Sequence, residues 1–339
     1  MKRGVLLAIA AAVAFGATTP IVAWASRGTF STAALLYAGA ALAAVLLKVV
    51  SRGGGEPLRR ADAPRVLLVA IFGAAAGPAL LVFGLARIGA TDGALLLNLE
   101  AVFTVLLARV VYREHIGRRV VAAMLAMVGG GALLVGQLDA RWSIVGALAI
   151  AGATLCWALD NTLTRPLAER EPLAVVAAKG ALGASLTTLA ALIAGESLPP
   201  LRETLALLAC GATGYGLSLR LYLLAQRAIG AARTGSVFAL APFVGTAIAI
   251  AMGDRALDAP LAGAAALFAL GVVLHITERH RHRHVHPATT HVHPHSHADG
   301  HHDHRHDPPF HGVHIHPHRH AEVDHDHDHG PDEHHAHTH

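Results

Sequence analysis

Glu100 is a carboxylate in the middle of a long apolar run, and it is the side chain of this sequence best placed to do chemistry. The run lies between Ile88 and Glu114 and reads IGATDGALLLNLEAVFTVLLARVVYRE. An acid near the middle of a membrane-spanning helix is expensive in free energy and usually functional. It can bind a proton on one side of a membrane and release it on the other. A fixed role, as an interhelical hydrogen-bond acceptor or as a permanent partner of Arg220, stays open.

Further polar side chains lie in the other apolar runs. Lipid offers them no hydrogen-bond partner, so each must find one inside the protein. Asp160 is expected to pair with Lys179 or Arg220 near one mouth of the pathway. In the first run, Pro20 frees a carbonyl one turn back, and neighbouring threonine hydroxyls can satisfy it. The predicted polar pathway consists of Glu100, Asn98, Thr18, Thr19, Asp160, Asn161, Lys179 and Arg220.

Residues 278–339 form a tail that holds 24 of the 26 histidines. It has few apolar residues and several prolines, so it cannot bury a core and is predicted to be disordered. Neutral imidazoles beside Asp carboxylates bind Ni²⁺, Co²⁺, Zn²⁺ and Cu²⁺. We expect high capacity, little geometric selectivity and loss of metal below about pH 6, because imidazoles ordinarily titrate at about pH 6.5. The candidate ligands are His291, His293, His295, His297, His301, His302, His304, His306, His325, His327 and His329.

The composition excludes an ordinary soluble protein. Of the 339 residues, 53% are hydrophobic and 15% are charged, against about 25% charged in soluble domains. Cys156 and Cys210 lie in apolar runs without a CxxC pattern, so neither a disulfide framework nor a thiolate metal site is expected. The formal net charge of +4 is too small to indicate nucleic-acid binding. Since the sequence contains no nucleophile–base set and no phosphate loop, we do not expect an enzyme.

Ten apolar segments each have about the length that an α-helix needs to cross a bilayer. Their connections are short except for Ser51–Pro64, which is polar and Gly-rich. The first segment resembles a signal peptide, but residues 6–20 have a counterpart at 147–161, so we expect it to be retained. The predicted helices cover residues 4–25, 31–50, 65–86, 92–112, 118–136, 143–165, 172–194, 203–226, 232–252 and 259–277.

Lysine and arginine decide the predicted orientation, because they gather on the cytoplasmic side of membrane proteins. With a cytoplasmic N-terminus, ten crossings place 17 of these residues inside and 5 outside. The sequence therefore predicts a multi-pass protein of a bacterial-type inner (plasma) membrane, with both termini in the cytoplasm. The outside residues are Arg27, Arg87, Arg141, Arg202 and Arg255.

The run around Glu100 recurs later in the chain. Residues 229–254 read IGAARTGSVFALAPFVGTAIAIAMGD, and Gly89 and Gly230 are separated by 141 positions, as are Leu99 and Leu240. Five helices per copy is an odd number, so the second copy enters the membrane upside down. Inverted repeats are typical of secondary transporters, with a binding site near the midplane between the halves. We predict an all-α integral membrane protein of about ten helices, with repeats at 1–138 and 142–277 and the tail at 278–339.

The two copies resemble the EamA-type carriers of the drug/metabolite transporter superfamily. The resemblance is carried by Ile88-Gly89-Ala90 to Glu114, by Ile229-Gly230-Ala231 to Asp254, and by Gly214-Tyr215-Gly216. It covers about residues 4–277. It implies secondary transport, commonly outward, of small metabolites through about ten helices, without a cofactor.

The sequence departs from the family pattern at two places. Ala101 stands where the second copy has Pro242 and where the family usually has proline, and Gly253-Asp254 replaces the closing Gly-Glu. Proline removes a backbone donor and clashes with the preceding turn. We therefore predict helix bends at Pro20 and Pro242 and a straighter fourth helix, the one that contains Glu100.

The leading hypothesis is a secondary transporter that exports divalent metal (nickel, cobalt or zinc) collected by the tail. Export of small organic metabolites or amino acids, with the tail as an accessory metal buffer, fits about as well, because the membrane part lacks an obvious ligand set. A membrane-tethered metal store or sensor is the rival from another class, and the repeat and the midplane acid argue against it. The expected partners are the lipid bilayer, the substrate and protons coupled through Glu100. A homodimer stays open.

Overall fold

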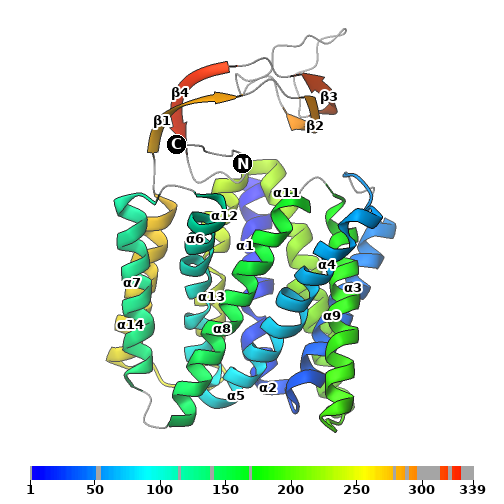
Figure 1. The fold of residues 1–339 in the computed structure, drawn as a ribbon. Coiled ribbons are helices and arrows are strands. Elements are labelled where there is room, and N and C mark those ends of the chain that lie inside the picture. Colours follow the sequence, from blue (N-terminus) through cyan, green and yellow to red (C-terminus); the bar gives the residue numbers. More distant parts are fainter. Residues whose placement is uncertain are drawn as a thin grey trace. The chain divides into compact units, whose positions relative to one another are not determined.

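The computed structural model describes residues 2–50, 55–113, 116–137, 141–167, 170–277, 280–286, 290–295, 314–319 and 323–329. The chain divides into two compact units, one built from the helices up to residue 278 and one from the tail that follows. Helices dominate the first unit (Figure 1), which confirms the predicted all-α fold class.

The two halves of the helical unit contain closely similar series of elements. The first half comprises α1 (Lys2–Gly16), α2 (Thr18–Ala25), α3 (Thr29–Val50), the 3-10 turn η1 (Arg60–Asp62), α4 (Ala63–Val69), the π-helix η2 (Ala70–Ala76), α5 (Gly77–Leu96), α6 (Leu99–Tyr112) and α7 (Arg118–Val135). The second comprises α8 (Arg141–Thr164), the 3-10 turn η3 (Arg165–Leu167), α9 (Pro172–Ile193), α10 (Leu201–Cys210), the π-helix η4 (Gly211–Leu217), α11 (Ser218–Ile229), α12 (Ala231–Phe238), α13 (Ala241–Ala251) and α14 (Ala259–Ile276).

Within the described residues, nine helical stretches are long and apolar enough to cross a membrane. One of them, Arg60–Leu96, joins the predicted third segment to the start of the fourth. The chain turns inside this stretch at Gly89, where φ is 80° and ψ is 175°. The rest of the fourth segment is α6, which has only 14 residues and is too short to count by itself. Counting Ala90–Tyr112 as one interrupted crossing gives the ten that were predicted.

The internal repeat is visible in the backbone. The π-helices η2 and η4 begin at Ala70 and Gly211, which are 211 − 70 = 141 positions apart. The turns at Gly89 and Gly230 have the same spacing, and their φ angles are 80° and 84°. A Cβ atom makes such positive φ angles unfavourable, so both turns favour glycine, which has none. Two unrelated backbone features at one spacing show that the repeat is structural.

The halves interlock through equivalent helices. α3 packs on its counterpart α9, and α7 packs on its counterpart α14. α5 packs on α8 and α1 packs on α11, which is the same pairing with the halves exchanged. The largest buried cluster draws on both halves and includes Leu36, Leu95, Ile150 and Phe268. A site at the centre of the unit is therefore lined by both halves.

The fourth and ninth helices are interrupted at equivalent positions. The ninth is interrupted at Ala239 and Leu240, immediately before Pro242, which lies in the first turn of α13. The fourth is interrupted at the equivalent Leu97 and Asn98, although Ala101 stands where the proline would be. At this interruption several backbone N–H groups donate to the carbonyl three residues earlier, as in a 3-10 helix; the Glu100 N–H, for example, donates to the Leu97 O at 3.0 Å. A local tightening to 3-10 geometry replaces the effect of proline.

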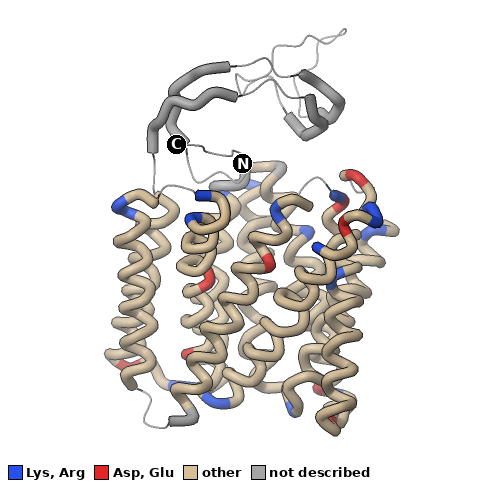
Figure 2. Tube along the Cα trace, in the orientation of Figure 1, with Lys and Arg blue, Asp and Glu red and all other residues tan. Residues whose placement is uncertain are grey.

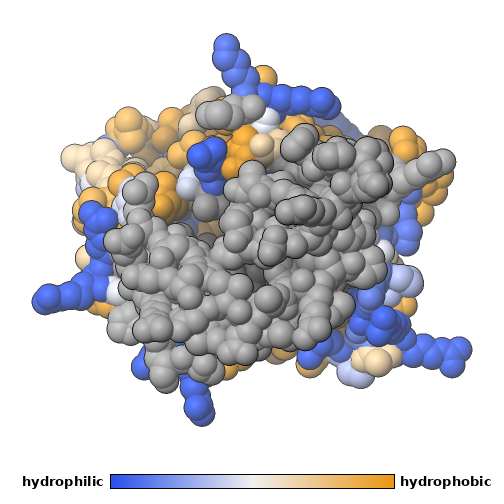
Figure 3. All heavy atoms as spheres, turned by 90° about the horizontal axis from the view of Figure 1, so that it is seen from above, coloured by the Kyte–Doolittle hydropathy of each residue, from blue (hydrophilic) through white to orange (hydrophobic). Residues whose placement is uncertain are grey.

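Charged residues gather at the two ends of the helical unit, and few lie between them (Figure 2). We call one end the basic end; seen from that end, long hydrophilic side chains project from the rim beside apolar surface (Figure 3). The opposite, far end carries both acids and arginines. The basic end includes Lys48, Arg59, Arg60, Arg65, Arg118, Arg119, Arg165 and Arg170, and the far end includes Arg27, Arg87, Glu196, Glu203, Asp254, Arg255 and Asp258.

The tail differs from the disorder predicted for it in containing short strands. β1 (His280–His286) pairs antiparallel with β4 (Val323–His329), and β2 (Thr290–His295) pairs antiparallel with β3 (His314–Arg319). The alternation of histidine with other residues has the period of a strand. An isolated two-stranded ladder is marginal in water, which fits the low apolar content of the tail.

Candidate functional site

Glu100 and Asn161 form the centre of the candidate site. Glu100 lies in the first turn of α6, directly after the interruption at Asn98, and Asn161 lies near the end of α8. The Asn161 Nδ2 donates a hydrogen bond of 2.8 Å to the Glu100 Oε1. Glu100 is half-buried and Asn161 is exposed, so a solute can reach the carboxylate. One group comes from each half of the chain.

Asp160 and Lys179 form the predicted ion pair beside this centre. The Lys179 Nζ contacts the Asp160 Oδ2, and only 6% of the Asp160 side chain is exposed. The Thr164 Oγ1 donates to the Asp160 Oδ1 at 3.3 Å. The pair presses against Gly73 of η2, where an added Cβ would lie 2.1 Å from the Asp160 Oδ2. Glycine at this position therefore lets a buried ion pair approach the helix backbone.

The Gly73 carbonyl is held by two aromatic side chains. The Tyr37 hydroxyl donates to the Gly73 O at 2.5 Å, and the Trp157 Nε1 donates to it at 3.1 Å. Such carbonyls become available where a helix widens to π geometry, a frequent feature of functional sites. η2 thus connects the ion pair to the aromatic part of the site.

Aromatic side chains from both halves form a cluster next to the polar centre. Tyr215 of η4 packs on Tyr37 with ring centroids 5.3 Å apart and lies edge-on to Phe15 at 5.7 Å. Phe238 of α12 contacts Phe15 at 5.4 Å and Tyr222 at 5.1 Å. The cluster can accept a flat apolar group, or a cation over a ring face.

The sequence analysis missed this aromatic cluster as part of the site. Among the five rings, only Tyr215 carried an argument, and that concerned the family resemblance. The available signal was the rarity of aromatic residues, which make up 5% of the chain. Tyr37 and Tyr215 in particular place hydroxyls inside apolar runs.

The polar residues of the first helix lie close to the cluster. Thr18 and Thr19 are each 2% exposed, and Thr18 Oγ1 donates to the Phe15 carbonyl at 2.7 Å. A side-chain hydrogen bond also links Thr18 to Tyr215. The interruption at Ala17, between α1 and α2, lies three residues before Pro20, which agrees with the predicted bend. The bond from Thr18 to Phe15 is the local i to i−3 bond that threonine hydroxyls form in helices. The carbonyl that Pro20 frees is that of Gly16, so its satisfaction by a threonine stays a prediction.

Two predicted pathway residues lie apart from this constellation. Arg220 donates to the Leu47 carbonyl at 3.3 Å, and no ion pair joins it to Glu100 or Asp160, both of which the structure describes. Asn98 is 6% exposed, and its Nδ2 donates to the Leu95 carbonyl at 2.9 Å. Asn98 therefore stabilises the helix interruption that precedes Glu100.

The structure brings together no metal centre among the residues that it describes: no three His, Cys, Asp or Glu side chains there could hold an ion. The register of β2 and β4 pairs histidine with histidine, for example His293 with His316 and His327 with His282. Metal binding by the tail stays a prediction. Of its candidate ligands, His291, His293, His295, His325, His327 and His329 lie in these strands, and His297, His301, His302, His304 and His306 lie outside the described residues.

Polar contacts between the halves close both ends of the helical unit. At the far end, Arg255 binds Asp92 through contacts of 2.6 and 2.8 Å, and Asp254 accepts from the Thr91 N–H at 2.8 Å. At the basic end, Arg170 pairs with Glu56 and, at 2.9 Å, with Asp62. Each contact joins a loop of one half to a segment of the other. The central site thus lies between two cross-repeat connections.

Each half of the helical unit matches the same known sequence family. The profile of the EamA-like transporter family matches residues 2–136 and again residues 144–277. The chain belongs to the EamA-like transporter family. It is accordingly a multi-pass membrane protein of a transporter family, as the resemblance implied.

Other similarities agree with this assignment. An uncharacterised transporter of Methanothermobacter thermautotrophicus is 26% identical over 213 residues, which is 60% of this chain and 62% of that protein. A solved crystal structure superimposes with a TM-score of 0.59 and 19% identity, covering 80% of this chain and 97% of the other. At that identity the structural likeness concerns the fold alone. Within this EamA-like fold, Glu100 and Asn161 lie where the halves meet.

Proposed function

We propose that this EamA-like transporter exports a small organic solute that carries a positive charge or an amino group. The observation that supports this substrate class best is the half-buried Glu100 carboxylate, which is bound to Asn161. The Tyr37 and Tyr215 rings, one from each half, pack together near Gly73, which the neighbouring Asp160–Lys179 pair contacts. A carboxylate attracts a cationic head, and ring faces attract cations and flat apolar groups. Lys179 already has Asp160 as its partner, which leaves Glu100 as the acceptor for substrate.

Proton exchange at Glu100 supplies the driving force in this proposal. A carboxylate in a membrane-embedded site can bind a proton or a cationic substrate, but not both at once. Because each displaces the other, a proton that moves inward is exchanged for a substrate that moves outward. The orientation proposed with this mechanism puts the basic end and both termini in the cytoplasm of a bacterial-type inner membrane, because lysine and arginine favour that side. Export then runs from the basic end to the far end.

The experiment is solute exchange in vesicles that contain the full chain. A proton gradient is imposed, and uptake is measured for radiolabelled small amines, neutral aromatic solutes and radioactive nickel. The proposal expects gradient-dependent uptake of amines, inhibited by other amines, and no such uptake in vesicles with Glu100→Gln. Uptake of neutral solutes alone would contradict the assigned substrate class.

Export of divalent metal is the second candidate, favoured by the 24 histidines after residue 277. In this version the tail collects Ni²⁺, Co²⁺ or Zn²⁺ and raises its concentration at the basic end. Growth of a deletion strain across a metal panel, with intracellular metal measured, tests it. Full export of an organic solute after deletion of residues 278–339 would make the tail an accessory buffer. A metal store that transports nothing predicts no solute exchange at all.

A further inference from the structure

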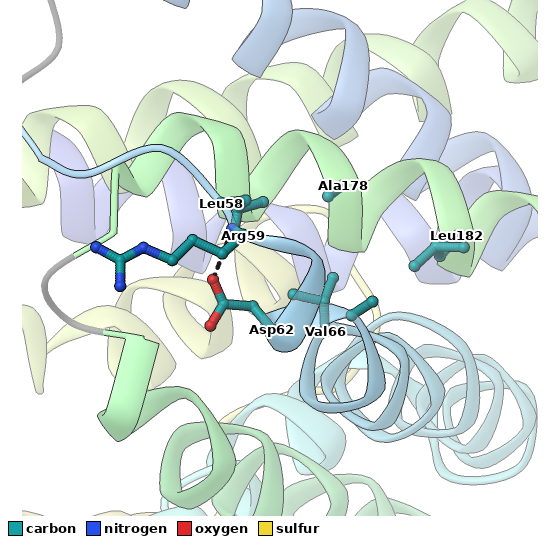
Figure 4. Close-up of a pocket in the computed structure, with 7 residues that line it drawn as sticks. Leu58, Arg59, Asp62, Val66, Ala178 and Leu182 are labelled. Carbon is teal, nitrogen blue, oxygen red and sulfur yellow. Dashed lines mark hydrogen bonds between the residues drawn. The ribbon is translucent and has the colours of Figure 1, made fainter.

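A hollow of about 250 Å³ lies between α4 and α9 at the basic end (Figure 4). Arg59 lies toward one end of this hollow and Leu182 toward the other. Asp62 accepts a hydrogen bond of 2.8 Å from the Arg59 backbone N–H, which fixes the turn above the hollow. The walls between these ends are apolar. The lining residues are Leu58, Arg59, Asp62, Ala63, Val66, Ala178 and Leu182.

The hollow opens on the lateral surface of the helical unit. Leu182 is 37% exposed, and it shares one face of α9 with Leu189 and Ile193, which are 57% and 79% exposed. A helix face that stays apolar and exposed along its length in a membrane-spanning unit lies against lipid chains. Of α9, only Ala178 and Leu182 line the hollow. Leu182 is ten residues after Pro172, so the deepest lining residue lies about 15 Å from the start of α9. That distance is about half of the ~30 Å hydrocarbon thickness, the depth of one leaflet.

The polar mouth of the hollow has a positive balance. Arg59, Arg60, Arg65 and Arg170 contribute four positive charges, and Glu56 and Asp62 contribute two negative charges, which leaves 4 − 2 = +2. Arg170 and Arg59 are engaged by the two acids. Arg60 and Arg65 are exposed, and neither makes an ion pair with any residue that the structure describes. These two arginines do not line the hollow, but they neighbour lining residues in sequence: Arg60 follows Arg59, and Arg65 precedes Val66.

We propose that this hollow is a binding site for one anionic phospholipid of the leaflet at the basic end. One acyl chain lies along Val66, Ala178 and Leu182, and the headgroup phosphate lies between Arg60 and Arg65. Juxtamembrane arginines attract anionic headgroups, and basic pockets between helices are suited to them. The depth of Leu182 in the membrane corresponds to the length of an acyl chain in one leaflet, and the positive charges of Arg60 and Arg65 favour an anionic headgroup. A zwitterionic lipid would fill the apolar hollow but would leave these two charges without a counterion.

The site lies directly behind the polar centre. Ala178 in the hollow is followed by Lys179, which pairs with Asp160 on the other side of α9. α4 leads into η2 and Gly73, the glycine that the same ion pair touches. A lipid chain between α4 and α9 therefore sets the spacing of the two elements that hold Asp160 and Lys179 together. The proposal does not depend on the transported substrate.

The test measures lipid retention by the full-length protein. The protein is equilibrated in vesicles of equal phosphatidylglycerol and phosphatidylcholine, extracted in mild detergent, and analysed by native mass spectrometry for lipid that stays bound. The wild type is expected to retain one phosphatidylglycerol. The variant Arg60→Gln/Arg65→Gln is expected to lose preference for it about fivefold per arginine, since each basic side chain near an anionic surface contributes about that factor. Ala178→Phe fills the hollow without changing the charge and is expected to abolish retention of either lipid.

The matched control is Arg3→Gln/Arg118→Gln, which removes two exposed arginines from the basic end, neither of them lining the hollow. It should retain phosphatidylglycerol as the wild type does. Equal loss in both double variants would reduce the effect to general surface charge and overturn the proposal. Equal retention of phosphatidylcholine by the wild type would also overturn it. Because Arg60 and Arg65 are exposed, their replacement leaves the fold intact even if Ala178→Phe does not fold.

Discussion

The Asn161 Nδ2 donates a 2.8 Å hydrogen bond to the Glu100 Oε1 across the boundary between the two halves of the chain. Glu100 belongs to α6 of the first repeat, and Asn161 belongs to α8 of the second. The position equivalent to Asn161 in the first repeat is Pro20 (161 − 141 = 20), which has no donor. The symmetry of the backbone is therefore not carried into the polar groups. The position equivalent to Glu100 in the second repeat is Ala241 (100 + 141 = 241), so the carboxylate–amide contact has no counterpart there.

Replacement of Glu100 by glutamine is expected to abolish proton-driven exchange. Glutamine keeps the size and a hydrogen-bond acceptor for Asn161, but it can neither bind a proton nor attract a cationic solute. Exchange should fall about tenfold or more, which corresponds to a loss of at least ~1.4 kcal/mol. Glu203→Gln at the far end, where Glu203 pairs with the exposed Arg27, is the control and should exchange normally. Unchanged proton-dependent exchange in Glu100→Gln would remove Glu100 from the mechanism.

Asn161→Ala tests whether the amide positions that carboxylate. A hydrogen bond to a charged group contributes about 1.5–3 kcal/mol, so the variant should exchange substrate roughly tenfold or more slowly. Thermal unfolding should change little because Asn161 is exposed. Asn161→Gln, which retains the amide, should recover part of the rate. A variant that unfolds at a much lower temperature but exchanges normally when folded would assign Asn161 a structural role only.

Gly73→Ala is expected to destabilise the protein by about 1–3 kcal/mol, the usual range for overpacking in a close-packed interior. The added methyl group would lie 2.1 Å from the Asp160 Oδ2 and 2.7 Å from the Lys179 Nζ, so the ion pair must move. Gly129→Ala in α7 is the matched control, because its nearest atom would be the Leu267 Cδ1 at 3.9 Å. Thermal unfolding in one detergent compares the two. Equal melting temperatures of the two variants would mean that the Asp160–Lys179 ion pair moves aside without loss of stability.

The helices and the repeat could be predicted from the sequence because both depend on local patterns. A run of about twenty apolar residues specifies a membrane-spanning helix with little help from its surroundings. The 141-position spacing of Gly89 and Gly230 could likewise be predicted, since glycine suits turns with such backbone angles. The Asp160–Lys179 pair followed from the need of each charge for a partner in lipid.

The remaining features depend on packing between distant segments. η2 and η4 are π-helices, and nothing in their sequences indicates π rather than α geometry. Their position follows from how α3, α8 and α9 pack around them. The interruption before Glu100 occurs without the proline that predicted it, because Asn98 stabilises it through the Leu95 carbonyl. The aromatic cluster unites rings from α1, α3, η4, α11 and α12. No spacing along the chain brings these rings together.

The Asp258 carboxylate makes stability at the far end depend on pH. The Arg255 guanidinium, and after it the Leu261 N–H, hold the pKa of Asp258 below its usual range. A depressed folded-state pKa contributes stability above the unfolded value of about 3.9, and that contribution disappears as the pH falls through the folded value. Asp258→Asn keeps a neutral cap but loses the charge. Its melting temperature should be lower than that of the wild type at pH 7, and the difference should vanish below about pH 3. A difference independent of pH would contradict this assignment.

Arg255 pairs with both Asp92 and Asp258, and we expect its pair with Asp92 to contribute more to stability. Both distances to Asp92 are short, at 2.6 and 2.8 Å, and only 8% of the Asp92 side chain is exposed, against 48% for Asp258. Buried partners lose more when separated, because the remaining charge is left without water or a counterion. We expect Asp92→Asn and Arg255→Gln to be coupled by about 0.5–3 kcal/mol in a double-mutant cycle of unfolding.

The matched cycle, Asp258→Asn with Arg255→Gln, should give a clearly smaller coupling, because exposed ion pairs contribute little to stability. Because Asp92 belongs to the first repeat and Arg255 to the second, the stronger coupling measures how firmly the halves are joined at the far end. A protein that must open at this end to release solute has to break that contact in each cycle. Asp92→Asn should therefore also bias the protein toward opening, seen as faster labelling of a cysteine placed at Thr91. Equal coupling in both cycles, together with unchanged labelling, would make the contact an ordinary surface ion pair.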